Sequence, residues 1–310
     1  MPARGWCKGQ GGEERVSRAE RLAAASIGLG CLVLGLKAAA WWLTRSAALY
    51  SDALETTVNV AASALALAAL RFAARPADAN HPYGHAKAEF FAAVIEGVLI
   101  VVAALLIFRQ AEIAFLAPHR LGPLPVGMAL NAAATVLNAG WSWWLLRAGR
   151  ALRSPALTAD GRHLLADVVT SVGILAGLGL VALTGLRLLD PALAAATGVY
   201  VLWSGIATIS ASVGGLMDAA PEPAVVQRIR ELVAENAAGA LEAHDLRTRH
   251  AGRLTFLEFH LVVPGAMSVA DSHAICDRIE AALKREMDHL MITIHVEPEA
   301  KAKQHGVPVV

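Results

Sequence analysis

Charged residues are scarce in this sequence. Lys, Arg, Asp and Glu together make up 17% of its 310 residues, whereas an average soluble protein has about 25%. Hydrophobic residues make up 56% and aromatic residues only 5%. This composition is a poor fit to an ordinary cytosolic enzyme or to a disordered chain. The net charge is +1, so no basic field indicates a nucleic-acid partner.

Cysteine is scarcer still. The chain has three cysteines, Cys7, Cys31 and Cys276, and no CxxC pair. Because their number is odd and their spacing is wide, the sequence indicates neither a disulfide framework nor a zinc site built from thiolates.

Long apolar runs, in contrast, are abundant, and nearly all of them lie before Met217. A bilayer span needs about 20 mostly apolar residues. We therefore expect a transmembrane domain over residues 21–217. Its six spans are predicted at residues 22–43 (interrupted only by Lys37), 47–70, 88–108, 121–146, 156–183 and 191–217. Residues 1–20 are interpreted as a cytoplasmic tail. A signal peptide is the alternative, but no clear small-residue cleavage site ends the first run.

Lys and Arg are unevenly distributed between the ends of the predicted spans. The N-terminal tail, residues 71–87 and residues 147–153 are richer in them than the connections on the other side. Cytoplasmic loops of membrane proteins carry such an excess. We expect a multi-pass protein of the inner or plasma membrane with both termini in the cytoplasm.

The composition changes at Asp218, after which the chain looks soluble. Apolar spacing and β-branched runs predict secondary structure in the order helix, strand, strand, helix, strand, at residues 225–236, 241–248, 254–263, 269–286 and 290–296. This order predicts a small cytoplasmic α+β domain over residues 218–299. Residues 300–310 are expected to form a flexible C-terminus.

Ionisable residues inside membrane spans are costly, about 2.5–3.5 kcal/mol for a charge at the bilayer centre, and therefore indicate function. His163 and Asp167 are four residues apart in the fifth span, and Glu55 and Asn59 are four apart in the second. Residues at this spacing share one helix face. If the two faces oppose each other, the four side chains form a tetrahedral cation site at which protons compete with metal. The alternative is that His163 and Asp167 only tie the helices together.

Two further acids accompany this predicted site. Asp52 and Asp160 lie three residues before Glu55 and His163, respectively. We expect them to cap the helices, relay protons or line the access path.

A third group of polar residues lies between the second and third spans. Asp78, His81 and His85 place one carboxylate and two imidazoles within eight residues, which suits a cation site at the membrane surface. The alternative is a solvated loop with helix-capping residues.

Histidine is concentrated in the tail, which holds seven of the eleven. His244, His260 and His295 lie on or beside predicted strands, and Glu297 follows two residues after His295. Imidazole and carboxylate ligands suit zinc and similar metals. We interpret these residues and His273 as metal ligands, whereas His250, His289 and His305 are interpreted as surface histidines.

Four segments of the chain resemble the cation diffusion facilitators, a family of proton-coupled exporters of divalent metals. They are SDALETTVN (51–59), NHPYGHAKAE (80–89), ADGRHLLAD (159–167) and AHDLRTR (243–249). The resemblance implies a six-helix membrane domain, a metallochaperone-like (ferredoxin-like) cytoplasmic domain and a homodimer. The implied sites are a transport site of Glu55, Asn59, His163 and Asp167, a loop site of Asp78, His81 and His85, cytoplasmic sites of His244, His260, His273, His295 and Glu297, and a salt bridge between Lys87 and Asp218.

The second span departs from the family pattern. Zinc-transporting members carry His or Asp and then Asp where this chain has Glu55 and Asn59. An amide in place of a carboxylate removes one negative charge and one proton-binding group. Zinc is the leading cargo implied by the resemblance, and manganese, iron, cobalt, cadmium, nickel and sodium remain alternatives.

The resulting hypothesis is a divalent metal/proton antiporter that exports metal from the cytoplasm by alternating access. One alternative is a membrane-embedded metalloenzyme, against which the chain has no HExxH motif. Another is a membrane protein whose tail senses metal without transporting it.

Overall fold

A computed structural model describes residues 10–117, 121–152, 155–251, 254–287, 290–303 and 307–308. The chain divides into two compact units. The first comprises residues up to 69 together with 92–209, and the second comprises residues 70–91 together with 210 onward.

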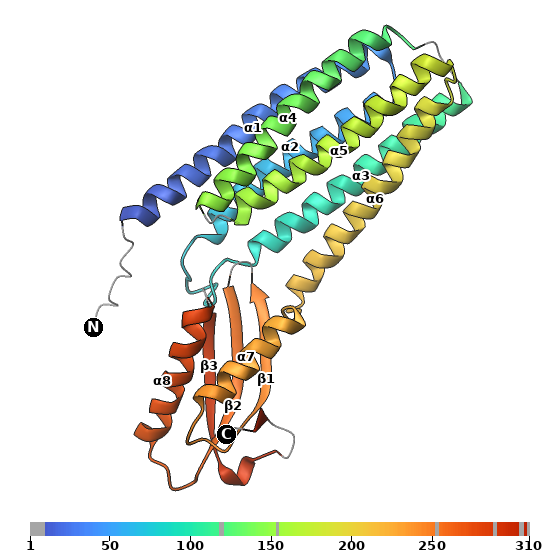
Figure 1. Cartoon of the computed structure of the whole chain (residues 1–310). Helices are drawn as coiled ribbons and strands as arrows, with labels where there is room; N and C mark the ends of the chain where they lie inside the picture. The colour runs from blue at the N-terminus through green and yellow to red at the C-terminus, as the bar shows by residue number, and fades with distance from the viewer. Residues whose placement is uncertain are drawn as a thin grey trace. The chain divides into compact units, whose positions relative to one another are not determined.

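Long helices make up the first unit and extend into the second (Figure 1). In chain order they are α1 (Gln10–Thr44), α2 (Ala47–Ala73), α3 (Ala88–Leu116), α4 (Leu124–Leu152), α5 (Pro155–Thr184) and α6 (Leu189–Leu216). These are the six helices that the apolar runs predict. Over the described residues, five of them contain a segment long and apolar enough to cross a membrane: Ala24–Thr44, Ala47–Ala73, Ala88–Leu116, His163–Thr184 and Leu189–Leu216.

The helix outside that set is α4, which has 29 residues and so is long enough for a span. Its hydropathy is reduced by polar side chains that the structure buries, Asn131, Thr135, Asn138 and Ser142. They recur at intervals of four, three and four residues and thus follow one face of the helix. The polar residues of α4 are therefore turned into the protein.

Two groups of helices pack closely within the first unit. Alanine and aliphatic side chains of α1, α2 and α5 form one buried cluster, Ala40, Ala48, Leu49, Ile174 and Leu178. Helices α3 and α6 approach each other at Gly97 and Gly205, where a Cβ on Gly97 would lie 3.1 Å from the Gly205 carbonyl oxygen. Small residues allow such close contact between membrane helices.

The second unit contains the α+β domain. Its elements are α7 (Pro223–Asn236), β1 (Glu242–Ala251), β2 (Leu254–Val263), α8 (Val269–Glu286), β3 (Leu290–Pro298), the 3-10 helix η1 (Glu299–Lys301) and β4 (Val307–Pro308). The strand order is β3-β2-β1-β4. Strand β2 pairs antiparallel with β1 and parallel with β3. The predicted order of elements is confirmed, while η1 and β4 lie where the sequence predicted no regular structure.

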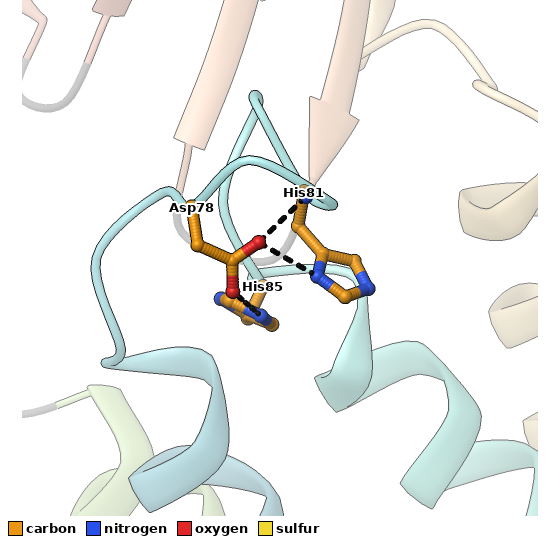
Figure 2. A group of neighbouring side chains, drawn as sticks. All are labelled: Asp78, His81 and His85. Atoms are coloured by element: carbon orange, nitrogen blue, oxygen red, sulfur yellow. Dashed lines mark hydrogen bonds and ion pairs between the residues drawn. The ribbon is translucent and has the colours of Figure 1, made fainter.

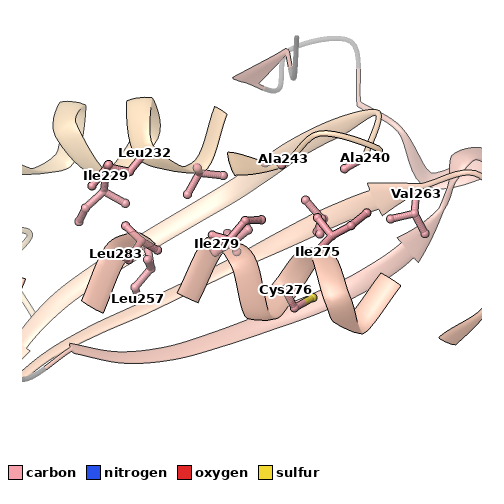
Figure 3. Close-up of a cluster of buried hydrophobic side chains, with 14 of the residues drawn as sticks. Ile229, Leu232, Ala240, Ala243, Leu257, Val263, Ile275, Cys276, Ile279 and Leu283 are labelled. Atoms are coloured by element: carbon pink, nitrogen blue, oxygen red, sulfur yellow. The ribbon is translucent and has the colours of Figure 1, made fainter. Parts of the chain in front are cut away.

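One face of this sheet packs against α7 and α8 (Figure 3). The buried core includes Ile229, Leu232, Leu257, Phe259, Leu261, Ile275, Ile279 and Leu283. On β2 the core residues alternate, so the residues between them, including His260, point to the opposite face. The sheet therefore presents its histidines on the side away from the helices.

Candidate metal centres

A lysine lies at the centre of the buried polar residues in the helical unit. The Lys37 Nζ on α1 donates hydrogen bonds to Asp52 Oδ1 at 3.0 Å, Asp167 Oδ2 at 2.9 Å and Ser171 Oγ at 3.0 Å. Lys37 and Asp52 are 0% exposed and Asp167 is 2% exposed. An ammonium group has three donors, and all three are used here. This ion pair network joins α1 to α2 and α5.

Asp167 is held by further donors from two other helices. Asn138 Nδ2 of α4 donates to Asp167 Oδ2 at 2.7 Å, and Asn59 Nδ2 of α2 donates to Oδ1 at 3.4 Å. Asp167 Oδ2 thus accepts two short hydrogen bonds. Oδ1 accepts one long hydrogen bond and retains the capacity to bind a cation.

Two other carboxylate oxygens have no partner in the part of the chain that the structure describes. Among the described residues, Asp52 Oδ2 and Glu55 Oε2 are buried and have no hydrogen-bond partner. Such an atom is costly to bury unless something binds it. One oxygen each from Asp52, Glu55 and Asp167 lies within 4.8 Å of the others, close enough to hold one metal ion. The cluster therefore has the donors and the unsatisfied capacity of a cation site.

The four residues expected at the transport site line a single cavity. Glu55, Asn59, His163 and Asp167 face it, together with Tyr200 and Ser204 of α6. The structure thus brings the predicted residues together, although the tight carboxylate group includes Asp52 and not His163. Asp160 lies apart from this group and hydrogen-bonds to Ser26 of α1.

The loop between α2 and α3 forms a second centre (Figure 2). Asp78 Oδ1 lies 3.1 Å from His81 Nδ1, and Asp78 Oδ2 lies 3.4 Å from His85 Nε2. The backbone amides of His81 and Asn80 also donate to Asp78 Oδ1. The His81 amide is the main reason that the pKa of Asp78 is lowered. The carboxylate is thus held in its charged form, which suits it to a cation.

A third centre lies on the face of the sheet that points away from α7 and α8, where His244 is buried and His295 is exposed. His244 pairs with His260 across β1 and β2, and His260 pairs with His295 across β2 and β3. The ring centroids are 5.3 and 5.0 Å apart. Glu297, two residues further along β3, lies 3.4 Å from His244 Nε2 and 3.3 Å from His260 Nδ1. Strand register thus gathers three imidazoles around one carboxylate.

Asp245 joins this third centre through an irregularity in β1. The pairing of β1 with β2 shifts between His244 and Arg247, and Asp245 adopts a positive φ of 51°. Bulges of this kind redirect side chains. Asp245, His244 and His260 form one of the groups that could hold a metal ion. A 2.5 Å hydrogen bond from Lys303 is the main reason that the pKa of Asp245 is lowered.

His273 is placed differently from the other predicted ligands of the tail. It lies on α8, is exposed, and pairs with Asp277 on the same helix at 3.7 Å. No metal-capable group found among the described residues includes it. Of the predicted surface histidines, His250 contacts Thr255 Oγ1 at 3.0 Å, while His289 and His305 lie outside the described residues.

The expected pairing of Lys87 with Asp218 is present, and it has a third member. Lys87 Nζ lies 2.9 Å from Asp218 Oδ1, and Arg249 Nη1 lies 3.3 Å from the same atom. The guanidinium of Arg249 also lies over the Phe256 ring, 4.2 Å from its centroid. Both cations lower the pKa of Asp218, chiefly the Lys87 hydrogen bond.

Two family models match the chain in succession. The cation efflux transmembrane domain matches residues 23–217, and the cation efflux protein cytoplasmic domain matches residues 221–299. The chain is a cation diffusion facilitator. It is similar to the uncharacterized transporter sll1263 of Synechocystis sp., with 42% identity over 90% of this chain and 91% of that protein. It is also similar to the cation-efflux pump FieF of Escherichia coli, with 30% identity over 92% of this chain and 95% of that protein. A solved zinc form of CzrB is 49% identical, covers 27% of this chain and 97% of its own, and has a TM-score of 0.27.

As a cation diffusion facilitator, the chain is an integral membrane protein that exports metal cations, and it is a transporter and not an enzyme. The predicted fold class is confirmed. Sequence reasoning did not find the part played by Lys37, Asn138 and Ser171 at the buried cluster. The available signal was a lysine in the middle of an otherwise apolar span, since such a charge is rare unless it has a partner.

Proposed function

We propose that this transporter exports a divalent metal cation from the cytoplasm in exchange for protons. The observation that carries the proposal is the carboxylate group of Asp52, Glu55 and Asp167, in which Asp52 Oδ2 and Glu55 Oε2 are buried without a hydrogen-bond partner among the described residues. It adjoins the cavity lined by Asn59 and His163. Metal and protons compete for the same lone pairs on carboxylates and imidazole. Protons entering from outside would displace the metal, and cytoplasmic metal would displace the protons.

Zinc is the proposed cargo, because the imidazole of His163 lies at the cavity and suits zinc. The carboxylates and the Asn59 amide also suit harder ions such as manganese. Iron, cobalt, cadmium, nickel and sodium complete the set to be compared. The proposed route is alternating access, in which the helices open the central site to one side and then to the other.

The loop and the tail are proposed to bind the same metal. In the loop the ligands are Asp78, His81 and His85. In the tail they are the imidazoles on the sheet with Glu297, and we propose that His273 contributes at an interface between two copies. The proposed assembly is a homodimer, supported by the match to the family's cytoplasmic domain. Metal bound at the tail would bias the transport equilibrium by favouring one arrangement of the protomers.

The proposed orientation places both termini in the cytoplasm. It rests on the excess of Lys and Arg at one end of the spans. The proposed limits are residues 21–217 for the transport domain and residues 218–299 for the cytoplasmic domain. The Lys87–Asp218 bridge would lie on the cytoplasmic side of the membrane.

Purified protein in proteoliposomes with a pH gradient tests the proposal. Uptake of zinc, cadmium, manganese, iron, cobalt, nickel and sodium is measured for the natural chain, His163→Ala and Glu112→Gln. We expect His163→Ala to abolish uptake, whereas Glu112→Gln changes an exposed acid on α3 and should leave it intact. Absence of flux for every cation in the natural chain would overturn the proposal, and metal binding without flux would favour the sensor. Normal flux in His163→Ala would overturn the site assignment alone.

A further inference from the structure

Lys37 places its side-chain nitrogen directly against two members of the carboxylate group. Its side chain is fully buried in α1, and its three donors are taken by Asp52, Asp167 and Ser171. Ser171 Oγ in turn donates to Asp52 Oδ1 at 2.8 Å. Burying an ammonium group is expensive unless it is paired and fully hydrogen-bonded. The pairing with two different helices meets that requirement.

The ammonium group and a metal ion would use different oxygens. Lys37 occupies Oδ1 of Asp52 and Oδ2 of Asp167. The other oxygens of the group remain for a cation, since Asp52 Oδ2 and Glu55 Oε2 are unpartnered among the described residues. Within the described part of the chain, Asp167 Oδ1 accepts only the long hydrogen bond from Asn59. Lys37 therefore holds one oxygen of each aspartate and leaves the remaining oxygens of the group for the cargo.

The charges also add up differently with and without the lysine. Asp52, Glu55 and Asp167 carry three negative charges when ionised, and the Lys37 ammonium cancels one of them. The remaining two negative charges balance the charge of one divalent cation. Asp52 supplies a third carboxylate and Lys37 offsets its charge, so the two residues form a compensating pair.

We propose that Lys37 is the charge-compensating and positioning residue of the transport site. It matches the site to one divalent cation by offsetting the charge of Asp52 and by orienting Asp52 and Asp167 from the α1 side. This inference rests on the proposed function. Without the ammonium group, the extra negative charge would hold the metal too tightly for release. Without Asp52, the site would bind the metal too weakly.

The test compares Lys37→Met, Asp52→Asn and the double variant with the natural chain. Zinc binding is measured by calorimetry on detergent-purified full-length protein, and zinc flux is measured in proteoliposomes. We expect Lys37→Met to tighten binding about tenfold and Asp52→Asn to weaken it about tenfold, because each changes the site by one charge in low dielectric. Each single variant should lose most of its flux. The double variant, which restores the net charge, should recover at least about tenfold over either single variant.

Lys301→Met is the matched control, because it removes the same charge from an exposed position on η1 and should change neither binding nor flux. A double variant as inactive as Lys37→Met would overturn the inference, and so would unchanged binding in Lys37→Met.

If Lys37→Met gives no monodisperse protein, the yield of monodisperse protein becomes the measurement. If the double variant recovers the yield of monodisperse protein, charge compensation is supported. If neither Lys37→Met nor the double variant gives monodisperse protein, the inference is overturned. Flux in the natural chain without recovery in the double variant refutes only this inference, whereas no flux in the natural chain refutes the proposed function.

Discussion

Asn138 of α4 donates a hydrogen bond of 2.7 Å to Asp167 of α5, and both side chains are buried. The acceptor is the same oxygen that Lys37 binds. A carboxylate held by two donors on one oxygen has little freedom to rotate. Asn138 therefore fixes the direction in which the other Asp167 oxygen faces the cavity.

Replacing Asn138 with Ala should lower metal flux at least about tenfold, because a lost hydrogen bond to a charged group costs about 1.5–3 kcal/mol. The measurement is initial uptake in proteoliposomes at several metal concentrations. Asn131→Ala is the matched control on the same helix, since Asn131 is also buried but its amide atoms have no partner among the described residues. Equal loss of flux in the two variants would show that any buried amide of α4 matters and that the Asp167 contact does not.

Replacing Asn59 with Asp should raise the affinity for divalent cations. The change adds a negative charge beside Asp167, where the Asn59 amide now donates at 3.4 Å. We expect binding to tighten about tenfold and the preference to move toward zinc. A flux panel across the seven cations, run on the variant and the natural chain, measures the preference among the cations. An identical ranking in both proteins would mean that Asn59 does not determine selectivity.

Replacing His260 with Ala should reduce the number of metal ions bound by the full-length protein. His260 is the middle imidazole of the row on the sheet, 5.3 Å from the ring of His244 and 5.0 Å from that of His295. Metal content after dialysis, measured by mass spectrometry on the purified protein, gives the stoichiometry. Retention of the full metal content would contradict the assignment of this row as a metal site.

His273→Ala provides the comparison on α8. Within one chain, His273 forms an ion pair with its helix neighbour Asp277. If it serves an interface between copies, its loss should weaken metal-dependent dimerisation and leave the metal site of the sheet intact. Light scattering with and without zinc measures the dimer. A dimer that is unchanged in both conditions would remove His273 from the set of ligands.

The Lys87–Asp218 bridge should contribute stability that depends on pH. The pKa of Asp218 is lowered in the folded protein, chiefly by the Lys87 hydrogen bond, so its contribution is present above the unfolded pKa of about 3.9. It is lost as the pH falls through the lower folded value. Both partners are partly exposed, so we expect Asp218→Asn to lower Tm by only about 1–3 °C at pH 7.

Thermal unfolding at pH 7 and near pH 3 measures this difference. It should shrink at the lower pH, which lies below the unfolded pKa, because protonation of the carboxylate then competes with the ion pair. Arg249 binds the same oxygen, so Arg249→Gln should show a smaller effect of the same sign. A difference between Asp218→Asn and the natural chain that stays constant with pH would contradict an ionic origin.

Local patterns were enough to predict much of this protein. Apolar runs of about 20 residues predict the helices, because the bilayer requires that length. The alternation around His260 and the spacing of four between His163 and Asp167 depend only on the repeat of a strand or helix. These repeats involve residues close together in the chain, so they can be predicted from the sequence itself.

Contacts between distant segments were decided only by the tertiary structure. Lys37 and Asp167 are 130 positions apart, and no local pattern shows that α1 lies against α5. The same holds for Asp52, whose carboxylate joins Glu55 and Asp167 because helix packing turns it inward. Strand register, which depends on pairing across the sheet, brought His244, His260 and His295 into one row and left His273 on α8. The sequence by itself determined which ligand types are present and on which elements they lie. Only packing decided which of them meet, because contacts between residues far apart in the sequence depend on how helices and strands pack and not on a local repeat.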